Sequence, residues 1–564
     1  PSACLQRETL DSTLNLPSKY PNNMNKIKYT TALLLGGLLS FSSCTDNFAD
    51  FNSTEGAYTD ELQKYDNQTN LVPFSTIQKG IIYQTGVDGT DWQYQIVQNL
   101  VADMFCGYFH DMTGSFNANN STYNLNNGWT SAMWVYTYGY VMPSIADAEA
   151  LNTEKEWPLY HAITKILKVA TLHRVSDYYG PILYDGFGTA AQKPQSQEEV
   201  YKRFFEDLGT AVNILKDYKG GVSFESADFM MPEGKRTPAQ WLKFANSLRL
   251  RLAMRVSNAA PELAEEQAKA ALDAANGGVL ETANETVGEY GIRNPLGGVA
   301  GWSEVYMNAN LESFLKGYND PRLKSYFNPA QDGRDKDGNI IKEVAGVKQL
   351  GSIEGDYKGV RQGTGVADNR YSTHSQTTIT TGSKIIVMSA AEVWFLRAEA
   401  ALRGYTSEDV ENCYKQGITV SFSQWDANGV SDYLESEETP AAYVDAFDEK
   451  FDADAPTSIT PKWDESATPE QKLERIITQK WLALYPEGCE AWAEQRRTGY
   501  PRLIKVAVNN SGNTISTDDM IRRVFFNQDY KTDNKALYDA LVGKLGGADN
   551  GGTRLWWDTG RNNF

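Results

Sequence analysis

Apolar residues recur every three or four positions through much of the chain, a spacing typical of amphipathic helices. The segment Thr237–Asn258 is representative. Its apolar positions are Trp241, Phe244, Leu248, Leu252 and Val256. At its start, Thr237 can accept a hydrogen bond from the first turn, Pro238 suits the first helical position, and Gln240 would complete a capping box. The pattern therefore predicts a helix that begins at Pro238.

The same period predicts further helices along the chain. They are expected over Trp157–Tyr179, Gln197–Asp217, Ser389–Arg403, Ser407–Ile418, Leu473–Tyr485 and Cys489–Arg497. Gly404 is a suitable C-cap for the helix over Ser389–Arg403, and the short connection to Ser407–Ile418 indicates an antiparallel hairpin. Stacked hairpins of this kind favour a tetratricopeptide-like helical repeat scaffold, although the period alone is too irregular to establish one. The predicted fold class is mainly α.

Long polar stretches separate the predicted helices. Those rich in Gly, Asn, Asp and Thr are Gly107–Gly128, Glu281–Gly301, Asn328–Ser383 and Ala427–Pro469. Loops of this length inside a compact domain usually carry function or are ordered by a partner. We therefore expect a helical scaffold with long loop insertions.

A short hydrophobic run near the start of the chain has the order of a secretory signal. Lys26 and Lys28 follow Met24, an apolar stretch covers Ala32–Phe41, and two serines precede Cys44. The stretch is too short to span a bilayer as a helix. Because a cysteine follows the small residues directly, the segment resembles a bacterial lipoprotein signal, which implies cleavage before Cys44 and acylation of that residue. Several acyl chains on Cys44 would anchor the protein firmly to a membrane.

These features divide the chain into predicted parts. Residues 1–23 fit no targeting pattern and are interpreted as a start-site artefact, and residues 24–43 are interpreted as the lipoprotein signal peptide. The polar and acidic residues 44–73 are expected to form a lipid-anchored tether, and residues 74–564 a single helical domain. The alternative, in which the leader is real and the apolar run is a core helix, is disfavoured because that run has no polar face.

Composition narrows the class of protein. The hydrophobic fraction of 41% and the charged fraction of 22% are typical of a globular chain. A net charge of −19 argues against nucleic acid as a partner and against an electrostatic attraction to anionic lipid. Beyond the leader and Cys44, the cysteines are Cys106, Cys413 and Cys489. Because they are far apart and odd in number, we expect buried thiols rather than disulfides or a zinc site.

The sequence contains none of the common catalytic motifs. We find no HExxH, GxSxG, Walker A loop or strand-associated GxGxxG. The histidines lack the short spacing of a metal-binding helix; they are His110, His161, His173 and His374. Asp335 starts a calcium-like pattern, but Ile340 and Gly346 stand where an EF-hand needs Gly and Glu, so an Asp-Gly turn is favoured. No catalytic residue, metal or cofactor is therefore indicated.

Several motifs occur together along the chain. They are CTDNF at Cys44, DYYGPILY at Asp177, TPAQWLKFANSLRLRLAMRVSN at Thr237, MSAAEVWFLRAEAALRGY at Met388, KWLALYPEGCEAWAEQRRTGYPRL at Lys480 and TRLWWD at Thr553. With these motifs in family order over nearly all of the chain after Cys44, the protein resembles the SusD/RagB family of nutrient-binding outer-membrane lipoproteins.

The resemblance implies a fold, a location and partners. It implies a single, mostly α-helical domain on tetratricopeptide-like repeats, anchored by lipid to the outer membrane and facing the cell exterior. The implied partners are a SusC-like TonB-dependent transporter and an oligosaccharide, or a peptide in some relatives, that is bound before import. Arg397, Glu399, Arg496 and Arg497 lie in the strongest motifs. We expect these side chains to hold helices together rather than to bind ligand, because paired Arg and Glu residues in helical bundles usually do so.

Two loop regions combine aromatic rings with polar side chains, as sugar binding requires. Aromatic rings stack on the apolar C–H faces of sugars, and polar side chains bind the hydroxyl groups. The candidate residues of the first region are Tyr108, Phe109, Asn120, Tyr123 and Trp129. Those of the second region are Tyr290, Arg293, Trp302 and Tyr306. Trp129 and Trp302 are the leading candidates because each adjoins glycine in a polar loop, while packing of the loops on the helices is the competing interpretation for every ring.

Other functions remain open from the sequence. A glycoside hydrolase needs two carboxyl groups about 5 to 10 Å apart across a cleft, a geometry that sequence does not reveal. A purely structural repeat protein would bind protein partners but no soluble ligand. We favour a binding protein without catalytic activity, because no carboxylate stands in a hydrolase motif.

Overall fold

The computed structural model describes residues 68–83, 91–111, 116, 119–560 and 562–564. The predicted start-site artefact, the signal peptide and Cys44 lie outside the described residues. Helix α3 (Gln68–Gly80) begins inside the stretch predicted as tether, and its Leu71 side chain is buried. The folded domain therefore includes residues that the sequence analysis assigned to the tether.

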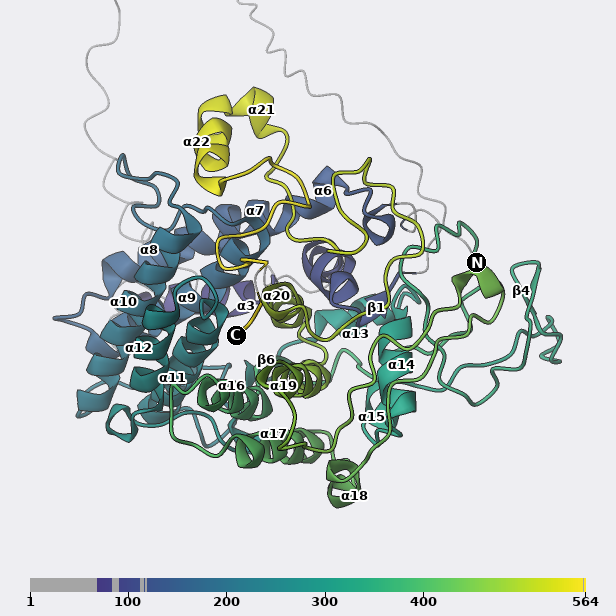
Figure 1. Ribbon diagram of the computed structural model, residues 1–564. Helices are drawn as coiled ribbons and strands as arrows, with labels where there is room; N and C mark the ends of the chain where they lie inside the picture. The colour runs from purple at the N-terminus through teal and green to yellow at the C-terminus, as the bar shows by residue number, and fades with distance from the viewer. Residues whose placement is uncertain (1–67, 84–90, 112–115, 117–118, 561) are drawn as a thin grey trace, which may run out of the picture. The chain divides into compact units, whose positions relative to one another are not determined.

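Helices form most of the regular structure in the described ranges (Figure 1). The first half contains α3, α4 (Asp91–Tyr94), α6 (Asn127–Thr130), α7 (Ala132–Tyr136), α8 (Met142–Leu151), α9 (Pro158–Tyr179), α10 (Gln197–Asp217), α11 (Pro238–Arg255) and α12 (Pro261–Leu272). The second half contains α13 (Pro295–Ala300), α14 (Ala309–Gly317), α15 (Leu323–Tyr326), α16 (Ala390–Leu402), α17 (Val410–Gln424), α18 (Val430–Leu434), α19 (Pro469–Leu484), α20 (Gly488–Thr498), α21 (Tyr530–Asp533) and α22 (Lys535–Leu545). Within these ranges, none of the helices combines the length and apolar character needed to cross a membrane.

Wider π-helical turns continue two of the helices. They are η1 (Gln95–Asp103), which follows α4, and η3 (Thr137–Val141), which follows α7. Short 3₁₀ turns lie at η2 (Asn120–Thr122), η4 (Glu225–Ala227), η5 (Ala274–Asn276), η6 (Ala283–Glu285) and η7 (Glu449–Phe451). Isolated π-helical turns are rare and occur often at functional sites, which directs attention to the surface around α4 and α7.

The strands are short and pair across long sequence separations. They are β1 (Phe109–His110), β2 (Val287–Glu289), β3 (Tyr306–Met307), β4 (Glu343–Val344), β5 (Val347–Lys348) and β6 (Ile385–Met388). β1 pairs with β3, β2 with β6, and β4 with β5, each antiparallel. Because His110 lies opposite Tyr306, the β1–β3 pair ties the first predicted loop region to the second.

Consecutive helices pack against each other as the hydrophobic period predicts. α9 lies against α10, α10 against α11 and α11 against α12, while α16 packs on both α17 and α19 (Figure 1). Each of these helices buries an apolar stripe on its neighbour, so that the stack forms one continuous core. The prediction of a mainly α, tetratricopeptide-like scaffold is confirmed.

Several helix boundaries follow from local signals. α10 has the predicted bounds, and Ser196 and Glu199 form a capping box at its start. α11 begins at Pro238 with Thr237 as its cap, but the Gln240 side chain donates to the carbonyl oxygen of Glu285 at 3.1 Å instead of completing a capping box. α19 begins at Pro469, four residues before the predicted start at Leu473.

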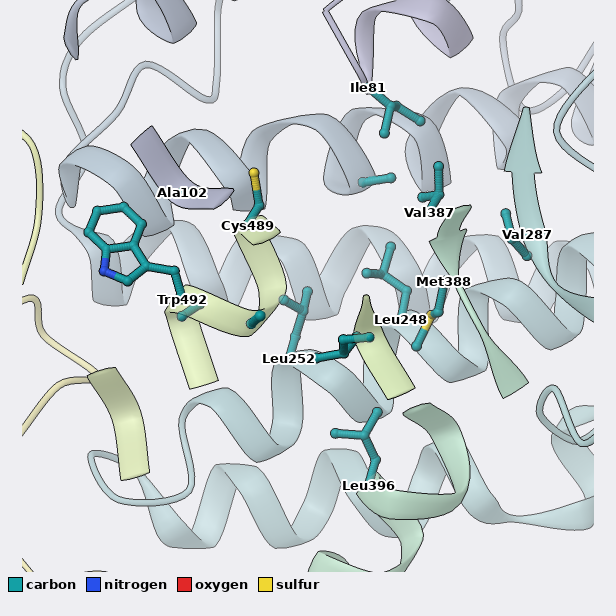
Figure 2. Packing of buried hydrophobic residues seen from close by; sticks show 14 of the residues in the cluster. Ile81, Ala102, Leu248, Leu252, Val287, Val387, Met388, Leu396, Cys489 and Trp492 are labelled. Atoms are coloured by element: carbon teal, nitrogen blue, oxygen red, sulfur yellow. The ribbon is translucent and has the colours of Figure 1, made fainter. Parts of the chain in front are cut away.

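The centre of the scaffold is formed by side chains from helices far apart in the sequence. Figure 2 shows Leu248 and Leu252 of α11 near Met388 of β6, with Leu396 of α16 below them and Trp492 of α20 to the left; all five belong to one buried cluster. Cys106, Cys413 and Cys489 are buried free thiols, as expected from their spacing.

Buried ion pairs join the same helices. They include Arg251–Glu392 at 2.6 Å, Arg255–Glu490 at 2.5 Å, Lys480–Glu494 at 3.1 Å and Arg497–Glu399 at 2.6 Å. Arg496 donates to the backbone carbonyls of Asp177 and Arg522. The prediction that the conspicuous Arg and Glu residues hold helices together is confirmed for Glu399, Arg496 and Arg497. Arg397 lies nearer the surface and pairs with Glu408 and Glu281.

Residues close to the C-terminus connect helices from both halves of the chain. The fully buried indole of Trp557 donates to Oδ1 of Asp177 at 2.9 Å and lies beneath the guanidinium groups of Arg255 and Arg496. The Asn563 side chain donates to the carbonyl of Thr498 at 3.0 Å and to Oε1 of Glu470 at 2.7 Å. This segment thereby fastens α9, α11, α19 and α20 to each other.

Candidate functional site

Most candidates of the first loop region are buried. Tyr108 donates its hydroxyl proton to the carbonyl of Trp481, and Phe109 packs on the rings of Phe327 and Tyr485. Asn120 donates to the carbonyl of Leu100 at 2.8 Å and accepts from the backbone N–H of Asn126 at 3.0 Å. These side chains fix the loop on the helices, so they do not present a surface to a ligand.

Tyr123 and Tyr306 are also buried. Tyr123 has a positive φ of 61° and packs edge-on against Phe105. Trp129 and Tyr290 are half-buried: Trp129 packs edge-on against Phe116 at 5.3 Å, and the Tyr290 hydroxyl donates to the carbonyl of Thr286 at 2.7 Å. Through these contacts, Tyr123, Trp129 and Tyr290 hold their loops in place.

Trp302 and Arg293 reach the surface, and α13 positions both. The Asn294 side chain caps α13 by accepting from the N–H groups of Leu296 and Gly297, and Pro295 occupies the first turn. Arg293 immediately precedes this cap, and Trp302 follows the end of the helix with 45% of its surface exposed. The six-residue helix α13 therefore lies between Arg293 and Trp302 and fixes their spacing along the backbone.

The contacts of Asp91 hold α13 against α4. Arg293 forms a bidentate ion pair with Asp91, with Nη2 at 2.6 Å from Oδ2 and Nε at 3.3 Å from Oδ1. A Cβ at Gly298 would lie 1.9 Å from Oδ2 of the same carboxylate, so only glycine permits this approach. One turn further, the Gln95 amide donates to Oε2 of Glu304 at 2.5 Å.

These contacts bring the segment that carries Trp92 next to the segment that carries Trp302. Trp92 directly follows Asp91 and is 46% exposed, and Trp302 lies between Gly298 and Glu304 in the sequence. The sequence analysis missed Trp92 because it falls at the start of a helix. The signal that selected Trp302 was a glycine beside a tryptophan in a polar loop, and a glycine also lies close before Trp92 in the letters VDGTD. We call Asp91, Trp92, Arg293, Trp302 and Glu304 the tryptophan face.

Two buried titratable residues, His110 and Asp111, lie near Glu304. Asp111 is buried, and neither of its carboxyl oxygens has a hydrogen-bond partner in the part of the chain that the structure describes. Burial, with a further contribution from the nearby Glu304 carboxylate, raises the pKa of Asp111 to about 8. Burial lowers the pKa of the adjacent His110 to about 4. At neutral pH the side chains of His110 and Asp111 are therefore largely uncharged.

We found no candidate metal site in the described ranges. They contain no group of three or more His, Cys, Asp or Glu side chains placed to hold a metal ion. The calcium-like string forms the Asp-Gly turn favoured by its sequence, in which Asp335 accepts from the N–H groups of Asp337 and Asn339, both at 2.9 Å, and Gly338 has a φ of 86°.

A hollow of about 540 Å³ lies between α12 and the α16–α17 hairpin, and neither Trp92 nor Trp302 lines it. Its charged lining includes Arg397, Glu281 and Glu408, which are paired with one another. Tyr405, its aromatic lining residue, is buried. This hollow therefore lacks the exposed flat ring that distinguishes the tryptophan face.

Comparison with known proteins places this chain in one family. The SusD-like family, described as SusD and RagB outer membrane lipoproteins, matches residues 50–558. A SusD homologue from Bacteroides vulgatus has 44% sequence identity and a TM-score of 0.81, covering 89% of this chain and 100% of its own. A chitin-binding SusD homologue from Flavobacterium johnsoniae has 36% identity and a TM-score of 0.79, covering 88% of this chain and 100% of its own. No curated protein matches.

The chain belongs to the SusD-like family of outer membrane lipoproteins. The Flavobacterium johnsoniae relative is a chitin-binding protein of this family.

Proposed function

We propose that this protein captures an oligosaccharide at the tryptophan face on the outside of the cell and passes it to a SusC-like TonB-dependent transporter in the outer membrane. The observation that carries the proposal is the pair of exposed indoles, Trp92 and Trp302, on two segments that the Asp91–Arg293 and Gln95–Glu304 contacts join. Lipid attachment at Cys44 and the transporter partnership rest on the sequence motifs and on family membership.

The face has the chemistry that a sugar requires. Each indole offers a flat apolar surface for the C–H face of a pyranose ring. Charged and amide groups beside the indoles provide donors and acceptors for hydroxyl groups. Arg293 is 43% exposed at its side chain and already oriented by Asp91, so the cost of ordering it on binding is reduced.

The same contacts weigh against a hydrolase. A glycosidase needs one carboxyl group free to donate a proton and another free to attack or to activate water. Asp91 accepts both hydrogen bonds of the Arg293 guanidinium, and Glu304 accepts from Gln95. Asp111 has the raised pKa of a general acid, but its side chain is enclosed. We therefore propose binding without turnover.

Isothermal titration of the purified protein with oligosaccharides and peptides tests this function. Chitin oligosaccharides come first, because a relative that is 36% identical binds chitin. We expect heat from one glycan class and a loss of affinity of about tenfold or more in Trp92→Ala and in Trp302→Ala, equivalent to about 1.4 kcal/mol each. The remote Trp394→Ala on α16, where the indole packs on Arg397, serves as the matched tryptophan control.

The outcomes separate the alternatives. Intact ligand recovered by chromatography supports capture, whereas shortened ligand would replace it with glycoside hydrolysis. Heat from peptides alone would assign the peptide-binding role. Equal affinity of the wild type and both tryptophan variants would remove the tryptophan face from the proposal.

A further inference from the structure

A row of aromatic rings continues from Trp92 to the half-buried Tyr136 and the exposed Tyr140. The ring centroids of Trp92 and Tyr136 lie 6.1 Å apart in an edge-to-face arrangement. Those of Tyr136 and Tyr140 lie 5.9 Å apart, with the rings stacked at 30°. Tyr140 is 53% exposed, which is high for a large aromatic side chain. The three rings therefore form a continuous apolar surface that water reaches at Trp92 and Tyr140.

The helical spacing explains the alignment of the tyrosines. Tyr136 ends α7, and η3 spans Thr137–Val141. Tyr136 and Tyr140 are four residues apart, which is close to one helical turn, so their side chains are neighbours on the helix surface. α7 in turn packs on η1, the segment that follows Trp92. The backbone thus fixes all three rings.

A cavity of about 290 Å³ adjoins the end of this row, between α3 and η3. Its lining includes Thr76, Tyr83, Tyr136, Gly139, Tyr140 and Ser144. A Cβ added at Gly139 would meet no atom within 4 Å, which shows open space at that point of the wall. Tyr83 contributes a buried hydroxyl that makes no hydrogen bond within the described part of the chain.

The cavity is chemically distinct from the tryptophan face. All of its lining residues are uncharged, and they offer hydroxyl groups beside two aromatic rings. An anionic ligand would find no counter-charge there, whereas a neutral sugar ring would find an apolar surface and hydroxyl partners.

We propose that Tyr136, Tyr140 and this cavity form a further subsite for the same ligand beside Trp92, and that the ligand is a neutral oligosaccharide long enough to contact both Trp92 and Tyr140. The inference rests on the proposed function, because the tryptophan face supplies the first part of the site. It adds a preference for neutral chains longer than a disaccharide.

Titration with a size series tests the subsite. The probes are the disaccharide to the hexasaccharide of the glycan class that binds, with the chitin and maltose series titrated first. We expect affinity to rise with chain length in the wild type. In Tyr140→Ala the affinity for the hexasaccharide should fall about threefold to tenfold, the worth of one aromatic contact, while that for the disaccharide should stay unchanged.

Two further variants sharpen this test. Val135→Ala removes another exposed apolar side chain of α7 that does not line the cavity, and it should leave both affinities unchanged. Gly139→Gln places a side chain at the open wall of the cavity and should lower hexasaccharide affinity without loss of folding, which circular dichroism checks.

The results distinguish failure of the subsite from failure of the function. Chain-length-independent affinity, or an equal loss for both probes in Tyr140→Ala, overturns the subsite while binding that depends on Trp302 still stands. An absence of heat from every glycan overturns both. Tighter binding of an acidic than of a neutral oligosaccharide overturns the predicted neutral class.

Discussion

Single side chains at the surface and beneath it show which residues sequence can identify. Trp302 was selected because it adjoins glycine in a polar loop, and it is exposed. Tyr108 and Phe109 satisfy similar local criteria, yet they are buried because they pack on α19 and β3, and Tyr123 is buried against Phe105. Trp92 was missed because it falls at the start of α4, outside the stretches that the sequence analysis interpreted as loops. Exposure of an aromatic residue is decided by partners that are distant in the sequence.

The buried carboxyl of Asp111 makes stability depend on pH. Its folded pKa of about 8 is above the ordinary value of 3.8, so between about pH 4 and pH 8 the folded protein keeps a proton that the unfolded chain has lost. The contribution of Asp111 to stability therefore falls as the pH rises through this window. Asp111→Asn should raise the free energy of unfolding by about 1 to 3 kcal/mol at pH 8 and change it little near pH 4.

Urea denaturation at several pH values measures this difference. Asp432→Asn, on an exposed position of α18, is the control and should show no pH-dependent gain. A gain in Asp111→Asn of the same size at both ends of the pH range would contradict the assignment.

At the scale of elements, the hydrophobic period predicted the long helices well. α9, α10, α11, α16 and α20 begin and end within a few residues of the predicted bounds. Shorter elements were not predicted, because β1, β3 and β6 depend on pairing across long separations rather than on local pattern. The start of α19 was missed although Thr468 and Gln471 form a capping box there, since that signal lay at the end of a stretch interpreted as loop.

Removing one partner of a buried ion pair between helices should destabilise the scaffold, because the other charge is then buried without compensation. Glu399 of α16 accepts from both Nη atoms of Arg497 of α20, at 2.7 and 2.6 Å, and from Arg403. Burial by itself would raise the pKa of Glu399, but Arg497 and Arg403 lower it below the ordinary value. Glu399→Gln should lower the free energy of unfolding by about 3 kcal/mol, because it leaves buried positive charge without its partner.

A matched exposed pair provides the comparison. Glu411→Gln removes the Glu411–Lys415 ion pair on the surface of α17 and should cost less than about 1 kcal/mol. Chemical denaturation of both variants gives the two values. Equal costs would show that the core pair contributes no more than a surface pair.

At the scale of the whole molecule, the proposed function assigns anchoring and ligand capture to separate parts of the chain. The family is one of outer membrane lipoproteins, and the lipoprotein motif predicts Cys44 as the acylated residue. Cys44→Ala should therefore move the protein from the membrane pellet to the soluble fraction while oligosaccharide binding is unchanged.

Cell fractionation with immunoblotting follows this change. Cys413→Ala removes a buried thiol within the scaffold and should leave the protein in the pellet. Retention of Cys44→Ala in the membrane fraction would place the anchor elsewhere.

The contacts of Trp557 and Asn563 also bear on biosynthesis. Asp177 and Arg496 are separated by more than half of the chain, and both contact the Trp557 indole, as does Arg255. A nascent polypeptide that has not reached residue 557 lacks these contacts between α9, α11 and α20. We therefore expect this part of the core to stay incomplete, and its apolar surface accessible to chaperones, until that residue has been synthesised.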